Sequence, residues 1–218
     1  MKKALMFRGG WEGHQPVETS EIVAEALRRR GVAVDISDSQ KCLLDPDLKT
    51  KYRLIVPVWT MGELGTEESR ALLDAVRNGV AVGGWHGGAG DAFRQNTEYQ
   101  FMIGGQWVAH PGGIVDYRVD IVEKEHPIVA GISGFSVHSE QYYMHVDPGN
   151  HVIASTTFDD AHASWIRGTV MPVVWTRFYG AGRVFYSSLG HTAADFKNTP
   201  EILEITARGL LWALDELK

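Results

Sequence analysis

Short apolar runs alternate with amphipathic segments in the first half of the chain. The runs are nearly continuous in apolar and small residues, as is typical of strands buried on both faces of a sheet. The segment 16–30 has helical periodicity, starts at Pro16 and precedes Gly31, and a second helix is predicted with Thr66 as its cap. This alternation predicts a doubly wound, mainly parallel α/β sheet. The predicted strands are residues 4–7, 32–36, 54–59 and 80–84.

The second half has strand-like segments with few helices between them. Gly180-Ala181-Gly182 is typical of a hairpin turn, so an antiparallel extension of the sheet is the simplest arrangement. A final helix is predicted from its apolar spacing, with Thr199 as cap and Pro200 in its first turn. Because no linker or repeat interrupts the pattern, residues 1–218 are expected to form a single domain. The strand-like segments are residues 114–122, 151–157, 170–178 and 183–189.

Composition narrows the class of protein. The chain has 21 Lys and Arg against 27 Asp and Glu, a net charge of −6, so nucleic acid is not an expected partner. The single cysteine, Cys42, cannot form an internal disulfide, which favours a reducing compartment. The N-terminal apolar run is too short for a signal peptide, and no window is apolar enough for a membrane span. We therefore expect a cytoplasmic protein with no membrane partner. A homo-oligomer is compatible with the sequence, but no segment requires one.

Polar and aromatic residues follow three of the predicted strands, in the segments 9–14, 59–62 and 85–88. Ligands of open α/β sheets bind beyond the carboxyl ends of the strands, where such loops meet. We therefore expect a pocket for a small hydrophilic ligand there. The alternative is that the glycines in these segments only allow tight turns.

The segment Gly84-Trp85-His86-Gly87-Gly88 has the glycine spacing of a nucleophile elbow, in which small neighbours let one strained residue project from a strand end. Histidine is a poor acyl-transfer nucleophile, but it is a good general acid, base or metal ligand near neutral pH. One of these roles is predicted for His86. A catalytically silent histidine bonded to the backbone is the alternative.

Several motifs, in their order along the chain, resemble the ThuA-like family of trehalose utilisation. That family is similar to class I glutamine amidotransferases, with a flavodoxin-like doubly wound sheet, and the resemblance implies a role in carbohydrate metabolism, in the processing of keto-sugars or disaccharides. Amidotransferases carry a cysteine where this chain has His86, so glutamine hydrolysis is not expected. Besides the elbow segment, the motifs are Gly104-Gly105-Gln106-Trp107-Val108-Ala109-His110-Pro111, His126-Pro127-Ile128, Glu140-Gln141-Tyr142-Tyr143, Pro172-Val173-Val174-Trp175 and the segment 182–191.

Three histidines, His14, His86 and His191, follow predicted strands or lie in the loops after them, so they are expected to converge. The resemblance adds Glu140, which stands where the family has an acidic residue before aromatic residues. Together they are the predicted catalytic residues, acting as acid and base beside a sugar carbonyl in an isomerisation or a hydrolysis. A divalent metal is left open as a cofactor. We favour a metal-free cluster, because the chain has no HExxH motif or close histidine pair. An ion pair of Glu140 with Arg183 is a purely structural alternative.

The sugar ligand is expected to contact residues near the same strand ends, together with aromatic rings that can stack on a sugar face. For the tryptophans Trp11, Trp59, Trp85, Trp107 and Trp175, packing in the core is the alternative. The predicted protein is thus an enzyme acting on a small sugar, keto-sugar or disaccharide. A non-catalytic sugar-binding or scaffold protein and a divalent-metal-dependent hydrolase are the alternatives. The ligand-binding candidates are Trp59, Thr60, Gly87, His110, Tyr142 and Trp175.

Overall fold

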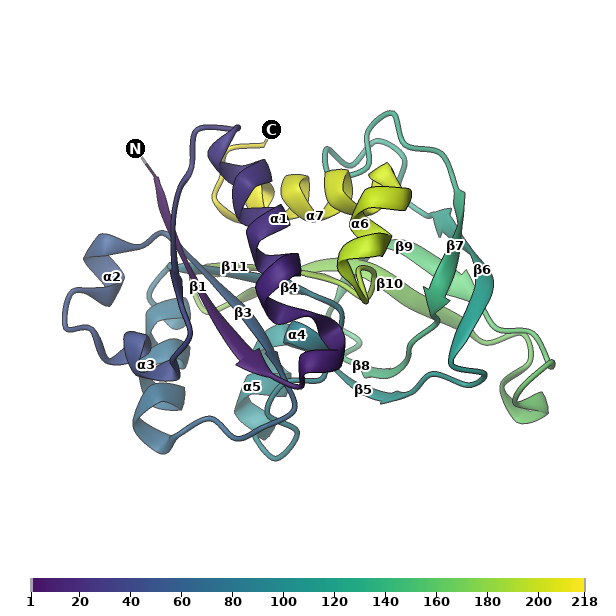
Figure 1. Ribbon diagram of the computed structural model, residues 1–218, viewed down its shortest axis with the longest axis horizontal. Helices are drawn as coiled ribbons and strands as arrows, with labels where there is room; N and C mark the ends of the chain where they lie inside the picture. The colour runs from purple at the N-terminus through teal and green to yellow at the C-terminus, as the bar shows by residue number, and fades with distance from the viewer. Residues whose placement is uncertain (1, 218) are drawn as a thin grey trace.

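Strands and helices alternate through the first half of the chain in the computed structural model, which describes residues 2–217 (Figure 1). The strands are β1 (Lys3–Gly10), β2 (Ala33–Ser37), β3 (Leu54–Thr60), β4 (Ala81–Trp85), β5 (Gly105–Ala109), β6 (Ile114–Ile121), β7 (Phe135–Glu140), β8 (Tyr143–Val146), β9 (His151–Thr157), β10 (Val170–Tyr179) and β11 (Gly182–Ser187). The helices are α1 (Pro16–Arg28), α2 (Leu48–Lys51), α3 (Thr66–Arg77), α4 (His86–Gly90), α5 (Thr97–Ile103), α6 (Ala193–Asn198) and α7 (Pro200–Ala213). The 3-10 helices are η1 (Glu12–His14), η2 (Gln40–Leu44) and η3 (Ser164–Ile166).

One nine-stranded sheet has the order β2-β1-β3-β4-β11-β10-β9-β6-β7. Its first five strands are parallel, with Gly10 of β1 beside Thr60 of β3 and Trp85 of β4 beside Ser187 of β11. The predicted doubly wound parallel sheet is therefore confirmed, and its carboxyl ends meet at one edge. The predicted cap of α3 was wrong by one position, because Gly65 is the cap and Thr66 is the first helical residue.

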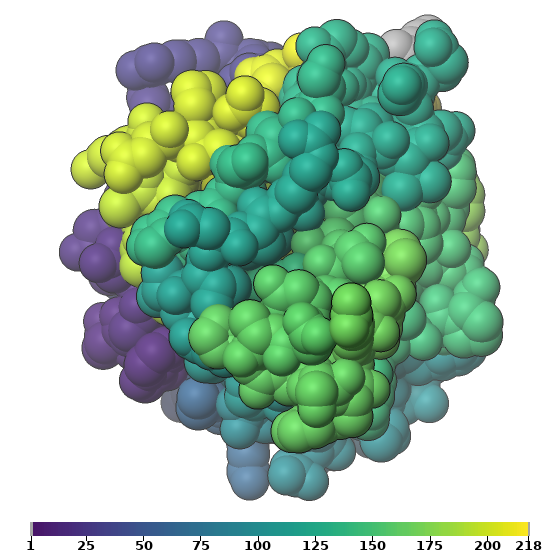
Figure 2. Space-filling view, turned by 90° about the vertical axis from the view of Figure 1, so that its right-hand side faces the viewer, coloured from purple at the N-terminus to yellow at the C-terminus, as the bar shows by residue number. Residues whose placement is uncertain are grey.

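The last four strands of the sheet extend it in antiparallel fashion. β11 and β10 form the predicted hairpin, and β9, β6 and β7 follow in turn. This confirms the antiparallel extension, although β7 was not predicted. A separate two-stranded sheet joins β5 and β8. Figure 2 looks onto this end of the molecule, where teal and green residues of the middle of the chain cover the face.

Helices cover both faces of the sheet. In Figure 1, α1, α6 and α7 lie above it, and α3 and α5 lie below it. Two apolar cores result, and buried residues such as Leu27 and Leu210 belong to the first, whereas Leu72 and Met102 belong to the second. Among the described residues, no helix has both the length and the apolar character needed to cross a membrane. The strand ends are thereby held between two packed layers.

Candidate active site

Four side chains meet at the carboxyl edge of the sheet. His14 lies in η1 after β1, His86 follows β4, His191 follows β11, and Glu140 ends β7. One ligand atom from each of the four lies within 4.8 Å of those of the other three. We call His14, His86, His191 and Glu140 the four-residue cluster.

The atoms of the four-residue cluster centre on one carboxylate oxygen. Oε2 of Glu140 lies 3.1 Å from Nε2 of His86, 3.4 Å from Nδ1 of His191 and 3.7 Å from Nε2 of His14. Nδ1 of His191 is also 3.3 Å from Nε2 of His86. All of these side chains except His191 are buried, and His191 is half-buried. The structure therefore brings together all four predicted catalytic residues.

His86 is held in place through its backbone and through Nδ1, the ring nitrogen that does not face Glu140. Its φ angle is 44°, a left-handed conformation that costs a β-carbon-bearing residue roughly 1–3 kcal/mol. Such a strained strand-to-helix turn agrees with the elbow spacing. Tyr186 donates a hydrogen bond to the His86 carbonyl, and Nδ1 of His86 lies 2.8 Å from the Ser188 carbonyl. Because a carbonyl only accepts, Nδ1 carries a proton and Nε2 faces Glu140.

His14 is fixed by Thr60 and Gly87. Its Nδ1 lies 2.8 Å from the Thr60 hydroxyl at the end of β3, which leaves Nε2 directed at Glu140. A Cβ on Gly87 would lie 2.2 Å from Cε1 of His14, so only glycine lets the ring sit there. Two residues predicted to touch the ligand thus position a histidine.

Asp195 in α6 joins the end of β7 to the loop after β11. Its carboxylate accepts a hydrogen bond of 2.6 Å from the Ser139 hydroxyl and one of 3.0 Å from the backbone N–H of His191. Glu140 and His191 are therefore held at a fixed separation. The alternative pairing of Glu140 with Arg183 is wrong, because Arg183 pairs with Asp215 instead.

Burial and hydrogen bonding set the charges of the cluster. Burial lowers the pKa of His86 to about 4, and burial also lowers the pKa of His191, so both rings are neutral near pH 7. Burial alone would raise the pKa of Glu140, but its contacts with His14 and His86 outweigh that effect and hold the pKa well below its usual range. Glu140 is thus a carboxylate beside the neutral imidazoles of His86 and His191.

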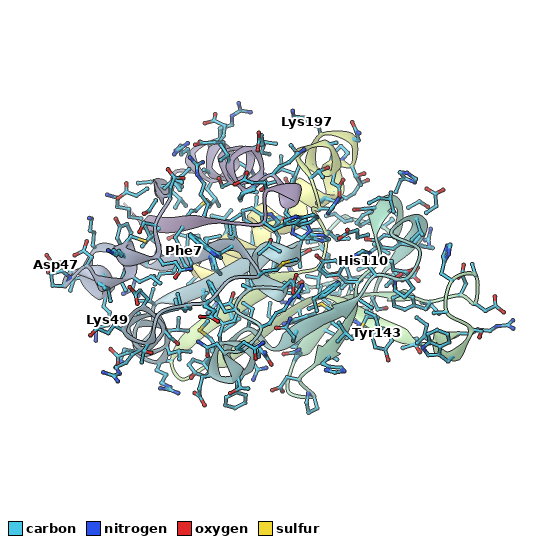
Figure 3. The ribbon with its side chains drawn as sticks, turned by 60° about the horizontal axis from the view of Figure 1, so that its bottom comes forward. Phe7, Asp47, Lys49, His110, Tyr143 and Lys197 are labelled. Carbon is cyan, nitrogen blue, oxygen red and sulfur yellow. The ribbon has the colours of Figure 1, made fainter. Side chains whose placement is uncertain are left out.

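Aromatic rings border the cluster on the other side of Glu140. Tyr142 stacks on His86 at a centroid distance of 4.0 Å, and Nε2 of His110 lies 3.6 Å from Oε1 of Glu140. The side chain of His110 is 35% exposed, and Figure 3 labels it near the middle of the molecule. Nδ1 of His110 and Nε1 of Trp107 are buried without a hydrogen-bond partner in the described chain. Trp11, 47% exposed, packs edge-on against His14.

One of the predicted ligand contacts was wrong. Trp175 is 0% exposed, packs on Tyr186 and donates its indole N–H to the Ile103 carbonyl, so it belongs to the core. Trp59 is half-buried with its ring over Gly9, and its contact with a ligand stays a prediction. The chain pattern shows that both residues lie on strands, but it does not show which face each ring occupies.

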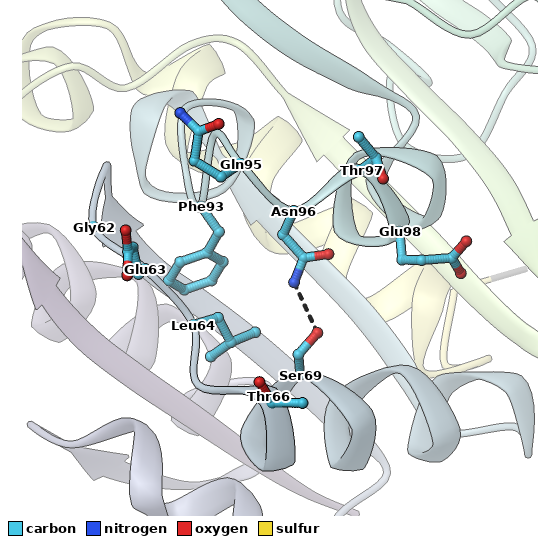
Figure 4. Close-up of a pocket in the computed structure, with 10 residues that line it drawn as sticks. All are labelled: Gly62, Glu63, Leu64, Thr66, Ser69, Phe93, Gln95, Asn96, Thr97 and Glu98. Carbon is cyan, nitrogen blue, oxygen red and sulfur yellow. Dashed lines mark hydrogen bonds between the residues drawn. The ribbon is translucent and has the colours of Figure 1, made fainter.

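The space around the cluster is unequal on its two sides. The void behind His14 and His86, which also touches Thr19 and Val58, has a volume of about 10 Å³, at or below the size needed for one water. That side of the cluster therefore has no room for a sugar. A larger pocket of about 450 Å³ lies between the loop after β3 and the start of α5 (Figure 4), where Asn96 donates a 2.7 Å hydrogen bond to Ser69. None of the ten residues drawn there belongs to the cluster.

Three positioning residues, Tyr186, Ser188 and Asp195, were not predicted. Tyr186 and Ser188 lie in the segment 182–191 that carries the family resemblance, but strand patterning gives no sign that they bond to His86. Asp195 lies four residues after His191, in the first turn of α6. This position was the only sequence signal for its contact with His191. Sequence reasoning found the reactive groups and missed most of their supports.

Comparison with known proteins agrees with the fold. Residues 3–213 match the family described as ThuA, trehalose utilisation. A ThuA-like protein from Parabacteroides merdae has a similar crystal structure, with a TM-score of 0.79, 21% identity and coverage of 98% of this chain and 90% of that one. A ThuA-like protein from Bacteroides uniformis has a TM-score of 0.77, 19% identity and coverage of 96% and 91%.

A β-galactosidase from Bacillus circulans sp. alkalophilus shares the fold over part of its length. Its TM-score is 0.62 at 17% identity, and the match covers 99% of this chain but 30% of the β-galactosidase. No curated protein matches the chain. At these identities the solved structures establish the fold alone.

Proposed function

The chain belongs to the ThuA family of trehalose utilisation, which implies a role in carbohydrate metabolism, and we propose that it is an enzyme that transfers a proton beside the carbonyl of a small sugar or keto-sugar. The observation that carries this proposal is the four-residue cluster, in which one ionised carboxylate lies among three imidazoles at the carboxyl ends of the strands. Such a cluster places several proton acceptors close to one bound substrate.

The chemistry of a keto-sugar matches these groups. A base removes the proton from the carbon next to the carbonyl, and the carbonyl oxygen becomes an enediol oxygen that must be stabilised. Return of the proton to the former carbonyl carbon, with loss of the proton on the neighbouring hydroxyl, gives the isomer. In a keto-glycoside whose glycosidic carbon lies next to the deprotonated carbon, the glycosidic C–O bond breaks instead, the departing oxygen takes up a proton, and water then adds to the resulting enone, which completes hydrolysis. His110, the most exposed imidazole beside Glu140, is placed to meet the substrate oxygen.

The border of the cluster supports a polyhydroxylated ligand. Nδ1 of His110 and Nε1 of Trp107 lack partners in the described chain, and sugar hydroxyls both donate and accept hydrogen bonds. Trp11 offers an exposed ring on which the C–H face of a sugar can stack. Trp59 and Trp175 are not part of this proposal. A small sugar as partner and a cytoplasmic location stay predictions.

Proton exchange provides the test. The protein is incubated in D₂O with a panel of keto-sugars, their parent sugars and disaccharides, and deuterium incorporation and product formation are followed by NMR and mass spectrometry. We expect deuterium at the carbon next to the carbonyl with wild-type protein, a loss of at least 100-fold with Glu140→Gln, and wild-type exchange with His138→Gln. His138 is an exposed histidine on β7 and serves as the matched control.

Two results would count against the proposal. Saturable sugar binding without exchange or product would favour a non-catalytic sugar-binding protein. Equal exchange rates for wild type and Glu140→Gln would move the chemistry away from the four-residue cluster.

A further inference from the structure

We propose that the four-residue cluster binds one divalent transition-metal ion through Nε2 of His14, Nε2 of His86, Nδ1 of His191 and Oε2 of Glu140. The role of the ion in catalysis rests on the proposed function. The site itself rests on the geometry of the ligand atoms, which is independent of the substrate.

The spacing of the ligand atoms suits a metal ion. Bonds of about 2.0–2.1 Å in a tetrahedral site separate neighbouring ligand atoms by roughly 3.3 Å. The contacts of Glu140 Oε2 with His86, His191 and His14 measure 3.1, 3.4 and 3.7 Å, and the nitrogens of His191 and His86 are 3.3 Å apart. Four of the six separations are thus close to the tetrahedral value, and all four ligand atoms lie within 4.8 Å of one another.

The directions of the ring nitrogens also suit a cation. The Ser188 carbonyl occupies Nδ1 of His86, so Nε2 is the ring atom that faces Oε2 of Glu140, at 3.1 Å. Nδ1 of His191 faces the same oxygen at 3.4 Å. A metal ion at this point would accept a lone pair from each of these three atoms.

The hydrogen bonds that hold the His86 and His14 rings resemble those found around metal-bound histidines. Such a ring generally uses its other nitrogen for a hydrogen bond that fixes the tautomer, most often to a carbonyl or a carboxylate. Nδ1 of His86 bonds to the Ser188 carbonyl, and Nδ1 of His14 bonds to the Thr60 hydroxyl. In both rings this leaves Nε2 directed at the centre of the cluster.

The donor set selects the class of metal. Three imidazoles and one carboxylate suit Zn²⁺, Fe²⁺, Co²⁺ or Ni²⁺, whereas Mg²⁺ and Ca²⁺ prefer all-oxygen sites. The void of about 10 Å³ behind His14 and His86 leaves no room for a substrate there, whereas His110, with a side chain 35% exposed, borders the cluster beside Oε1 of Glu140. A bound ion would supply Lewis acidity for a sugar carbonyl or hydroxyl oxygen. The proton-transfer role then falls to His110 rather than to the four ligands.

Metal binding is tested on protein made without an affinity tag. The protein is stripped with a chelator, dialysed and titrated with Co²⁺, followed by visible absorption and by elemental analysis, and then with Zn²⁺ by calorimetry. We expect one ion per chain, absorption bands of four- or five-coordinate Co²⁺, and displacement by Zn²⁺. Glu140→Gln and His191→Gln should each weaken binding at least 100-fold, and His138→Gln should leave it unchanged.

Two variants are used because either may fold poorly, and circular dichroism identifies a folded one. Wild-type protein that binds no more Co²⁺ than Glu140→Gln would overturn the site, and so would affinities in both folded variants equal to wild type. Tight stoichiometric binding without sugar exchange would support the site and sink the proposed function. If stripped protein binds no metal but keeps full exchange activity, the proposed function is supported and the metal site is overturned.

Discussion

Oε2 of Glu140 lies 3.1 Å from Nε2 of His86, although 54 residues separate them in the chain. His86 directly follows β4, near the centre of the sheet, whereas Glu140 ends its last strand, β7. The contact therefore joins the parallel half to the antiparallel extension, and changes in its supports should alter the whole cluster.

Thr60→Val removes the hydrogen bond to Nδ1 of His14 and nearly preserves side-chain volume. We expect metal affinity to fall roughly 10- to 100-fold, because the hydrogen bond with Thr60 holds the His14 ring in its orientation. Titration with Co²⁺ measures the change. The control is Thr206→Val, a buried threonine in α7 with no hydrogen-bond partner for its hydroxyl in the described chain. Equal affinities in the two variants would contradict the role of Thr60.

Gly87→Ala tests the contact beneath His14. The new Cβ would lie 2.4 Å from Nδ1 of His14, so the ring must move away from Thr60. We expect a loss of about 1–3 kcal/mol in the free energy of unfolding, as for other overpacked sites, together with weaker metal binding. Gly149→Ala, in an exposed turn, is the matched control and should change neither quantity. Wild-type metal affinity in Gly87→Ala would argue against a fixed His14.

Trp11→Ala tests sugar stacking. Loss of an exposed ring beside the cluster should raise KM for the sugar by about 10-fold, which corresponds to about 1.4 kcal/mol, with Co²⁺ affinity unchanged. Trp165→Ala removes a tryptophan that is 84% exposed in η3 and should leave KM as in wild type. An unchanged KM in Trp11→Ala would remove Trp11 from the binding site.

The pH dependence of stability should include a contribution from His126. Burial lowers the pKa of His126 below its usual 6.5 in the folded protein, so the unfolded chain binds more protons as pH falls through 6.5. The free energy of unfolding must then decrease in that range. In His126→Asn, which keeps an acceptor for the N–H of Ile128, the drop in Tm from pH 7.5 to pH 5.5 should be smaller. Identical drops in the two proteins would contradict this assignment.

Much of the fold could be predicted from the sequence, because parallel strands that are buried on both faces appear as apolar runs. The segment of β7, Phe-Ser-Val-His-Ser-Glu, alternates apolar and polar residues over its first four positions only, so its strand pattern is weak and it was missed. β7 forms a strand because it pairs with β6. That pairing is a long-range property which local patterns do not encode.

Part of the candidate site could be predicted from the sequence for the same reason. His14, His86 and His191 each follow a parallel strand, and such strands end at one edge, so their convergence could be predicted. Glu140 came from the family resemblance, because nothing local places the end of β7 beside that edge. Trp175 was misassigned because strand periodicity does not tell which apolar layer receives a ring.

β7 pairs with a single neighbour, since it is the last strand of the sheet. Edge elements of this kind open more readily than central strands, by local unfolding that native-state hydrogen exchange detects. A ligand held through Glu140 would have to leave before β7 could open, so occupancy would slow exchange of the β6 and β7 amides far more than that of β1 or β3. At a ligand concentration 100 times Kd, the added protection amounts to about 2.7 kcal/mol. Hydrogen exchange of the individual β7 amides would thus report whether a ligand is bound at the four-residue cluster.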